Sequence, residues 1–346
     1  MAEQNSRSYF ITGGAGFIGS HLSNKLLKTG NNVTVFDIEP KDSNTFLHTL
    51  QIDNKVQYIQ GDIRNYHDLE ILKYKSFDCV IHLAALPTSL LSNIAPNLIF
   101  DINVKGTEIL CNVLKDSIHG CLVFASSACA YGIPLPDTLP LKETYPSNEG
   151  FYNYSKSKQL AEHIVTDLDC MPCSIARFVN IYGPGDRHFS RIIPRIIRQL
   201  IFNKELSLSR TNGETILDFL YVEDAINGII ALENYCKDIS PKDHTELFNF
   251  GIGPSHAISI NDLIQKISQT YDGIDRPINM PSNTIEPVIS KYLDCSKAKK
   301  YLNWNPSILL PRGLEQTISW YKENINNINH LEDDCQEEFM KILISQ

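Results

Sequence analysis

Residues 9–27 read YFITGGAGFIGSHLSNKLL, and the order of residue types in this stretch decides the fold. Residues 9–12 are an apolar run suited to a buried strand. Apolar residues then recur at helical spacing from residue 17 until Gly30 ends the pattern. The GGAG between them carries almost no side chain, so a pyrophosphate can approach the backbone, where free N–H groups and the helix dipole favour its charge. The contacts expected here come from Gly13, Gly16, Phe17, Ile18 and Gly19.

An acidic residue at the end of the next apolar run narrows the cofactor. Asp37 directly follows Val35 and Phe36. Its carboxylate can accept hydrogen bonds from an adenosine ribose and would repel a 2′-phosphate. A glycine turn with a strand before it, a helix after it and an acid downstream is much more specific than glycines alone. We therefore predict NAD rather than NADP, against the alternative of a glycine turn in some other α/β protein.

Strand-like and helix-like segments alternate over the first half of the chain. Such alternation demands a mostly parallel, doubly wound sheet of the Rossmann type. Further contacts to the cofactor are expected from Asp62, Ile63, Ala84 and Asn103, and Asp62 can also cap the helix that follows it. The predicted strands are residues 56–60, 79–83, 121–125 and 174–178, and the predicted helices are residues 64–74, 96–117 and 152–168.

The pattern changes after Asn180, where Gly183-Pro184-Gly185-Asp186 breaks the alternation. We expect residues 1–180 to form the dinucleotide-binding domain and a smaller C-terminal substrate lobe to follow. Strands near 219–223 and 247–250 are expected to rejoin the main sheet. The predicted lobe covers residues 181–330, and residues 331–346 form an acidic tail.

Composition indicates an ordinary soluble protein. The formal net charge of −9 argues against a nucleic-acid or anionic-membrane surface, and no apolar run reaches the length of a membrane span. The nine cysteines, an odd number scattered through apparent core segments, fit free thiols in a reducing cytoplasm. Cys170 and Cys173 form a single C-x-x-C without a second pair, so no metal site is predicted.

Two residues one helical turn apart suit proton transfer. Tyr154 and Lys158 are i and i+4 on a predicted helix and share one face. An ammonium beside a phenol lowers its pKa, and such a tyrosine can take a proton from a sugar hydroxyl while hydride leaves the same carbon. Ser127, at the end of the preceding strand, can hydrogen-bond the oxygen that becomes a carbonyl. Tyr152 and Lys156 have the same spacing, which alone does not choose between the pairs.

Several motifs in order resemble the extended short-chain dehydrogenase/reductases. They are residues 12–19 (TGGAGFIG), Ser126-Ser127 before Tyr131-Gly132, and residues 154–158 (YSKSK) with Glu162. Residues 177–184 (RFVNIYGP) and 218–224 (DFLYVED) are similar to the nucleotide-sugar epimerases and dehydratases of that family.

This resemblance implies bound NAD, a nucleoside-diphosphate hexose substrate and a transient 4-keto sugar. It implies Ser127, Tyr154 and Lys158 as the catalytic triad, the last two also contacting the cofactor, and Asn180 near the substrate diphosphate. Members are commonly homodimers that pair the two longest predicted helices into a four-helix bundle.

Departures from the family pattern leave the reaction open. The 4,6-dehydratases carry Asp-Glu directly after the triad Ser/Thr, where this chain has Ala128 and Cys129, so ordinary 4,6-dehydration is disfavoured. A 4-epimerase needs nothing beyond the triad. Residues 125–129 also resemble the GDP-mannose 3,5-epimerases, in which a cysteine exchanges the proton beside the keto group.

The leading hypothesis is therefore an isomerase, an epimerase that inverts C4 or acts at C3 or C5 with help from Cys129. Alternatives are an unusual dehydratase that uses this thiol, a 4-dehydrogenase and, outside enzymes, an NAD-binding scaffold. The thiol can also be a small buried apolar group.

The predicted diphosphate site departs from the pattern as well. Epimerases often have an arginine just before the Asp-Phe of the strand motif, and Leu217 stands there in this chain. Arg187, Arg191 and Arg195 are candidates to supply the charge, with Arg191 favoured for its place before Ile192-Ile193-Pro194. The nucleotide base and the sugar stay open.

Overall fold

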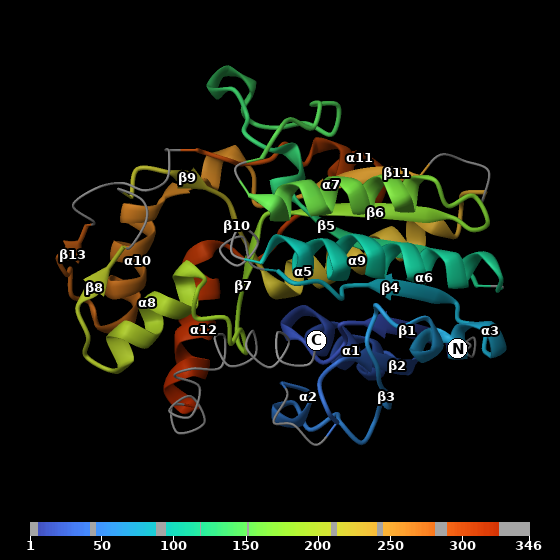
Figure 1. Ribbon diagram of the computed structural model, residues 1–346. Helices are drawn as coiled ribbons and strands as arrows, with labels where there is room; N and C mark the ends of the chain where they lie inside the picture. The colour runs from blue at the N-terminus through green and yellow to red at the C-terminus, as the bar shows by residue number, and fades with distance from the viewer. Residues whose placement is uncertain are drawn as a thin grey trace.

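The apolar runs of the first half form strands of one parallel sheet. A computed structural model of the chain describes residues 6–41, 46–87, 95–117, 119–150, 152–208, 213–240, 245–280 and 289–324. Seven strands lie in the order β11-β6-β5-β4-β1-β2-β3, and every neighbouring pair is parallel (Figure 1). The strands are β1 (Ser8–Thr12), β2 (Asn32–Asp37), β3 (Gln57–Gln60), β4 (Cys79–His82), β5 (Leu122–Ser127), β6 (Cys173–Phe178) and β11 (Glu246–Phe250).

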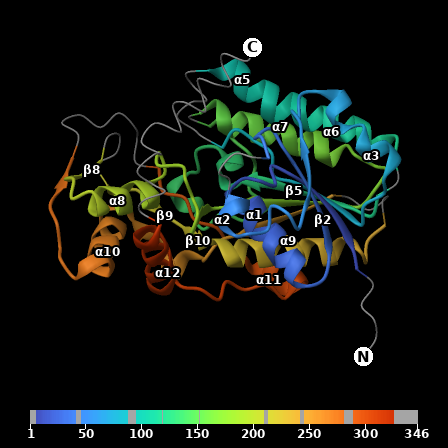
Figure 2. The ribbon, with the colours of Figure 1, turned by 90° about the horizontal axis from the view of Figure 1, so that it is seen from below.

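Helices cover both faces of this sheet, which is why its central strands are apolar without alternation. Figure 2 shows α5, α6 and α7 along one face and α1, α9 and α11 along the other. The predicted doubly wound Rossmann-type fold is confirmed. The covering helices are α1 (Phe17–Lys28), α5 (Pro96–Phe100), α6 (Gly106–Lys115), α7 (Asn153–Thr166), α9 (Val222–Cys236) and α11 (Ser296–Leu302), with short helices α2 (Phe46–Thr49) and α3 (Ile71–Tyr74) nearby.

The predicted helix 96–117 is present but not regular. Between α5 and α6 the chain forms a π-helical turn at Asp101–Lys105. Such a turn inserts extra backbone without ending the helix and is frequent at functional sites. In this chain the turn contains Asn103, whose side chain is buried.

One predicted strand does not join the main sheet. β10 (Phe219–Tyr221) pairs in parallel with β7 (Asn180–Tyr182) as a separate two-stranded sheet, and residues 222–223 already belong to α9. The prediction that 219–223 rejoins the main sheet is therefore wrong. All three β10 residues are buried, as in a central strand, but burial does not identify the partner strand. The other segment, as β11, pairs with β6 at the edge of the sheet.

A smaller group of elements follows β7 and lies at one end of the sheet (Figure 1). Its three helices pack against one another, and pairs of two-residue strands connect them. The predicted tail 331–346 lies outside the described residues. The elements are α8 (Ile192–Ile201), β8 (Leu206–Ser207), β9 (Ile216–Leu217), β12 (Ile258–Ser259), α10 (Ile260–Asp272), β13 (Ile278–Asn279) and α12 (Leu310–Glu323).

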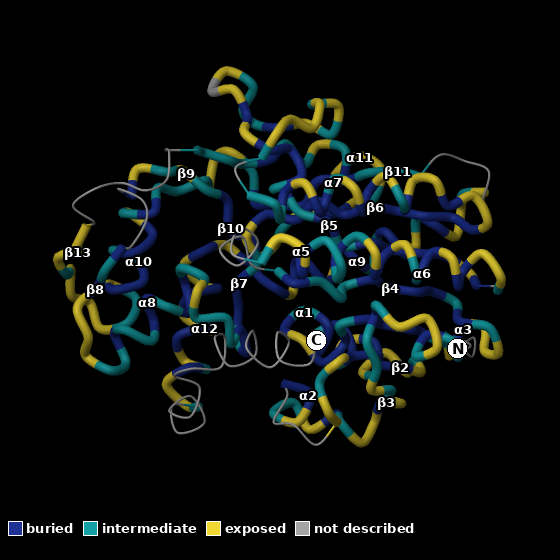
Figure 3. The backbone as a smooth tube through the Cα atoms, in the orientation of Figure 1, coloured by how far each residue is buried: buried dark blue, intermediate teal, exposed yellow. Residues whose placement is uncertain are grey.

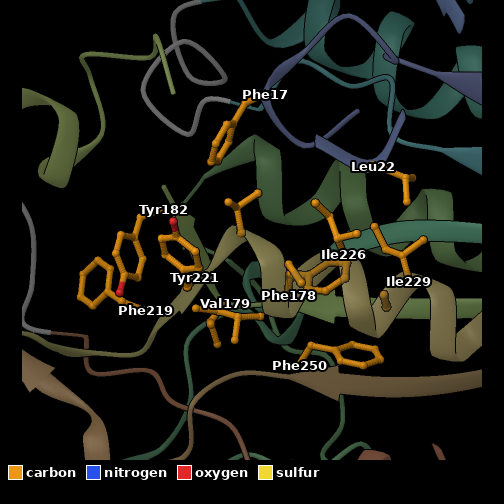
Figure 4. Packing of buried hydrophobic residues seen from close by; sticks show 14 of the residues in the cluster. Phe17, Leu22, Phe178, Val179, Tyr182, Phe219, Tyr221, Ile226, Ile229 and Phe250 are labelled. Atoms are coloured by element: carbon orange, nitrogen blue, oxygen red, sulfur yellow. The ribbon is translucent and has the colours of Figure 1, made fainter. Parts of the chain in front are cut away.

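The apolar core continues from the sheet into this second group. Phe178 and Phe250 pack with ring centroids 5.1 Å apart, and beyond them Tyr182 and Tyr221 meet at 5.5 Å (Figure 4). Figure 3 shows buried backbone running from the main strands into α8, α10 and α12. No helix within the described ranges combines the length and apolar character needed to cross a bilayer.

Candidate active site

The glycine turn is packed so tightly that Gly13 and Gly19 have no room for a side chain. Gly13 has φ +67°, and a Cβ on it would lie 2.8 Å from the backbone nitrogen of Ala84. A Cβ on Gly19 would lie 2.3 Å from the carbonyl oxygen of Gly13. Gly16 is the N-cap of α1 and offers no side chain to its first-turn N–H groups. This cradle fits the predicted pyrophosphate.

Asp37 closes the turn from the neighbouring strand. Its Oδ2 accepts a hydrogen bond from the Ala15 N–H at 2.9 Å, and its Oδ1 accepts one from the Glu39 N–H at 3.2 Å. Burial raises the pKa of Asp37, and these backbone hydrogen bonds oppose the rise. The carboxylate thus lies beside the glycine turn, as the sequence predicted.

Asp62 has a partner that sequence reasoning missed. Arg64 donates to both of its carboxylate oxygens, with Nη2 2.6 Å from Oδ2 and Nε 3.1 Å from Oδ1. Burial alone would raise the pKa of Asp62, but these hydrogen bonds lower it. The predicted helix 64–74 is a 3₁₀ turn (Tyr66–Leu69) followed by α3, and Asn65 caps it, so the prediction that Asp62 is its N-cap is wrong.

Asn103 lies within the π-helical turn, and Ile63 packs at the end of that turn. Ile63 packs against Gly106, where an added Cβ would lie 2.7 Å from its side chain. The Asn103 Oδ1 accepts the Leu86 N–H at 2.8 Å, and its Nδ2 donates to the Ser157 Oγ at 3.1 Å. Asn103 therefore ties the loop after β4 to helix α7.

Ser127, Tyr154 and Lys158 converge at the carboxyl end of β5. Ser127 ends that strand and lies close enough to Tyr154, in the first turn of α7, to lower the pKa of the tyrosine. Lys158 is buried, and its Nζ donates to the Ala125 carbonyl at 2.9 Å. In contrast, Lys156 of the alternative pair is exposed. The three residues of the predicted triad thus share one place.

Burial dominates the acidities in this group. It raises the pKa of Tyr154 and Cys129 adds to the rise, whereas hydrogen bonding and the charge of Arg191 lower it. Burial also lowers the pKa of Lys158 to about 8, against nearby negative charge. The predicted lowering of the tyrosine pKa by Lys158 is therefore wrong, because burial prevails and the favourable charge comes from Arg191.

Cys129 lies in a 3₁₀ turn that we call the Cys129 turn, residues 128–131. Ser127 caps this turn, since its Oγ accepts the Cys129 N–H at 3.1 Å. The thiol is half-buried and lies close enough to Tyr154 and Lys158 to raise the pKa of both. Ala128 is buried instead. Of the two residues that replace the dehydratase carboxylates, the thiol faces the triad.

A buried polar network behind the triad was not predicted from sequence. Arg177 and Glu162 form an ion pair with both side chains buried, and the Ser126 hydroxyl donates to the same carboxylate. The guanidinium stacks 4.2 Å from the Tyr131 ring, and the Tyr131 hydroxyl donates to the Asn249 Oδ1 at 2.8 Å. The only sequence signal was that these residues lie in recurring motifs.

Asn180 and Arg191 lie on the side of the smaller lobe. Asn180 is exposed at the start of β7, and its Nδ2 donates to the Asp218 carbonyl at 3.3 Å. Arg191 precedes α8, and its Nη1 lies 3.0 Å from both carboxylate oxygens of the buried Asp186. Its influence on the pKa of Tyr154 places its charge close to the triad.

Comparisons with known proteins agree with this geometry. Residues 9–249 match the family described as "NAD dependent epimerase/dehydratase family". The chain is 30% identical to a UDP-glucuronate 4-epimerase of Thermodesulfobacterium geofontis, over 93% of this chain and 98% of the relative. It is also 30% identical to a UDP-glucose 4-epimerase of Lactobacillus helveticus, over 86% and 91%.

Among the solved structures that resemble this chain is a UDP-glucuronic acid 4-epimerase from Bacillus cereus in complex with UDP-glucuronic acid and NAD. It is 25% identical, has a TM-score of 0.78, and the match covers 91% of this chain and 99% of that one.

The buried ammonium of Lys158 makes stability depend on pH. Its pKa is about 8 in the folded chain against an ordinary value of 10.5, so the unfolded chain binds more protons between these values. The free energy of unfolding contributed by Lys158 therefore rises by about 3 kcal/mol as pH increases from 8 to 10.5. We expect the Lys158→Met variant to lack this rise in urea unfolding experiments. Parallel pH profiles would contradict the assignment, and Lys156→Met is the control.

Proposed function

The chain belongs to the NAD dependent epimerase/dehydratase family, so it is an NAD-dependent enzyme of that family, and we propose that it is a UDP-sugar 4-epimerase. The observation that carries the proposal is the contact of Ser127 with Tyr154 beside a turn that lacks both dehydratase carboxylates. The uridine nucleotide follows from the named relatives, which act on UDP-glucuronate and UDP-glucose.

We assign the cofactor to the cradle between β1 and α1. The backbone from Gly13 to Gly19 receives the pyrophosphate, Asp37 the adenosine ribose, and Asp62 the adenine. The tight packing of the turn supports this assignment, since a Cβ on Gly13, Gly14 or Gly19 would come within 2.8 Å of another atom. NAD held there would supply the acceptor for the hydride of sugar C4 and would be regenerated within one turnover.

Tyr154 takes the proton from O4 of the sugar, and Ser127 hydrogen-bonds the same oxygen as it becomes a carbonyl. Burial raises the pKa of Tyr154, which makes its phenol a weaker acid and its phenolate a stronger base for the O4 proton. The positive charge of Arg191 opposes this rise and helps the first proton transfer. Lys158, whose Nζ donates to the Ala125 carbonyl, is proposed to hydrogen-bond the cofactor ribose as well.

Inversion at C4 needs the 4-keto sugar to present its other face. No further acid or base is required for that step, which fits a turn whose members next to Ser127 are Ala128 and Cys129. Ordinary 4,6-dehydration would require carboxylates at these two places. The lobe of α8, α10 and α12 is proposed to hold the nucleotide, with Asn180 and Arg191 at the diphosphate.

A second candidate reaction has its own supporting observation. The Cys129 thiol lies beside Tyr154 and Lys158, so a ketone at C4 would have a thiol near C3 or C5. A 4-ketone acidifies both positions, and a thiolate can exchange their protons. Epimerisation at C3 or C5 is therefore the alternative to inversion of C4.

Replacing Tyr154 by Phe tests the proton transfer. Loss of the hydroxyl is expected to lower kcat on the accepted UDP-sugar by about 10²- to 10⁴-fold. Tyr152→Phe removes the hydroxyl of the other pair with the same spacing and should leave kcat unchanged. Full activity of Tyr154→Phe, measured by chromatography of the epimeric products, would exclude the assignment.

Turnover in deuterated water separates the two reactions. Inversion of C4 alone should give product without deuterium on carbon, because the C4 hydrogen does not exchange with solvent. Action of Cys129 should place deuterium at C3 or C5, visible by NMR, and Cys129→Ala should abolish it. Cys170→Ala, which removes an exposed thiol elsewhere, is the control. Product lighter by one water would contradict both reactions.

We also propose a homodimer that pairs α5–α6 and α7 of two chains into a four-helix bundle. These helices lie side by side on one face of the sheet (Figure 2), and Leu160 on α7 is 38% exposed. The described cysteines are free thiols, which supports the reducing cytoplasm as the location.

A charge on the outer face of α7 tests the dimer. Light scattering should give twice the chain mass of 39.1 kDa for the natural protein, and Leu160→Arg should reduce it to one chain. Leu135→Arg, at an exposed leucine in the loop after the Cys129 turn, should leave the dimer intact. A measured mass of one chain for the natural protein would contradict the proposed dimer.

A further inference from the structure

A short segment of the smaller lobe reaches across to the Cys129 turn. The Lys291 N–H donates to the Ile216 carbonyl at 2.9 Å, and Lys291 pairs with Leu217 as an isolated parallel bridge. Two residues later, Leu293 pairs with Leu141 in the same way. Residues 290–294 are therefore held between the lobe and the loop that follows the Cys129 turn.

The side chain of Lys291 continues this connection. Its Nζ donates to the Gly132 carbonyl at 2.8 Å, across 159 residues of sequence. Gly132 directly follows the Cys129 turn, and its N–H donates to the Cys129 carbonyl at 2.9 Å. The ammonium is thus hydrogen-bonded to the residue that directly follows the turn containing Cys129.

The ammonium is left with unused donors. A lysine ammonium has three N–H groups, and within the described ranges the Gly132 carbonyl is its only hydrogen-bond partner and no carboxylate forms an ion pair with it. Lys291 is nevertheless half-buried. By contrast, the half-buried Lys297 is paired with Glu246. Within the described residues, the Lys291 ammonium therefore keeps two N–H groups available to an anion.

We infer that Lys291 binds an anionic group on the sugar itself, the carboxylate of a hexuronic acid. The inference rests on the proposed function, which puts C4 of the sugar at Ser127 and Tyr154. C6 is bonded to C5, the neighbour of C4, so a carboxylate there remains within reach of the Cys129 turn. The diphosphate is attached to C1, on the opposite side of the ring, and extends toward Asn180. The favoured substrate is accordingly a UDP-hexuronate rather than a UDP-hexose.

A purely structural lysine would look different. Lys322 donates one hydrogen bond to the Tyr271 carbonyl at the same 2.8 Å, but it is exposed and joins two helices of the lobe. It lies on α12 and makes no contact with the Cys129 turn among the described residues. Lys322→Met is therefore the matched control for Lys291→Met.

Calorimetric titration of the full chain with saturating NAD tests the inference without depending on turnover. The ligands are UDP-glucuronate, UDP-glucose and UDP. The natural protein should bind UDP-glucuronate more tightly than UDP-glucose. Lys291→Met should weaken the binding of UDP-glucuronate by about tenfold or more and the binding of UDP-glucose and UDP by less than about threefold. Lys291→Arg should retain most of the preference, and Lys322→Met all of it.

Equal weakening of all three ligands would overturn the inference and assign Lys291 to the diphosphate or the fold. If Lys291→Met does not fold, the natural protein still decides, since absence of a preference for UDP-glucuronate also overturns it. Selective loss of UDP-glucuronate binding without any 4-epimer product would sustain the role of Lys291 while removing the proposed function. If the protein epimerises UDP-glucose but Lys291→Met has no selective effect on UDP-glucuronate binding, the proposed function stands and the role of Lys291 does not.

Discussion

The buried pair of Arg177 and Glu162 is the interaction on which the geometry of the site depends. The Arg177 Nε lies 2.9 Å from the Glu162 Oε1, and the two side chains have only 6% and 9% exposure. Glu162 stands one turn beyond Lys158 on α7, and its carboxylate also accepts the hydroxyl of Ser126, the neighbour of Ser127. Removing either partner would leave an unpaired buried charge, so the strand end and the helix are held in one arrangement.

This arrangement explains why the acidities of the site are set by burial. Lys158 lies among apolar groups, with its Nζ 5.0 Å from the centre of the Phe124 ring, and its pKa falls to about 8. Burial and the nearby lysine also lower the pKa of His82 to about 3, so this histidine is neutral and bridges Thr12 and Thr107. Burial of this kind strengthens the electrostatic effect of each charge in the site. The charge of Arg191, held by Asp186, consequently acts on Tyr154.

The features that the sequence predicted correctly are local along the chain. The features that it missed depend on contacts between residues that are far apart in the sequence or on the local backbone conformation. The glycine turn and Asp37 are readable because strand, turn and helix follow one another directly. Tyr154 and Lys158 are readable because a helix fixes their spacing, although that spacing equally fits Tyr152 and Lys156. The pairing of β10 with β7 was missed, since a buried strand reveals burial and not its neighbour. Arg64 beside Asp62 was missed because a short turn replaced the expected helix.

The same limit applies to the charges around the substrate. The sequence has Leu217 where an arginine was expected, and Arg187, Arg191 and Arg195 were predicted to supply the charge instead. In space, Leu217 is bridged to Lys291, whose side chain leaves the same short ladder. Bridge partners project to the same side of a sheet, so Lys291 can place positive charge on the side where residue 217 carries none. The long aliphatic stem carries that charge past the lobe to Gly132, at the end of the turn that contains Cys129. A cation at the sugar end of the site, rather than at the diphosphate, favours binding of an acidic sugar over a neutral one. It does so without altering the triad.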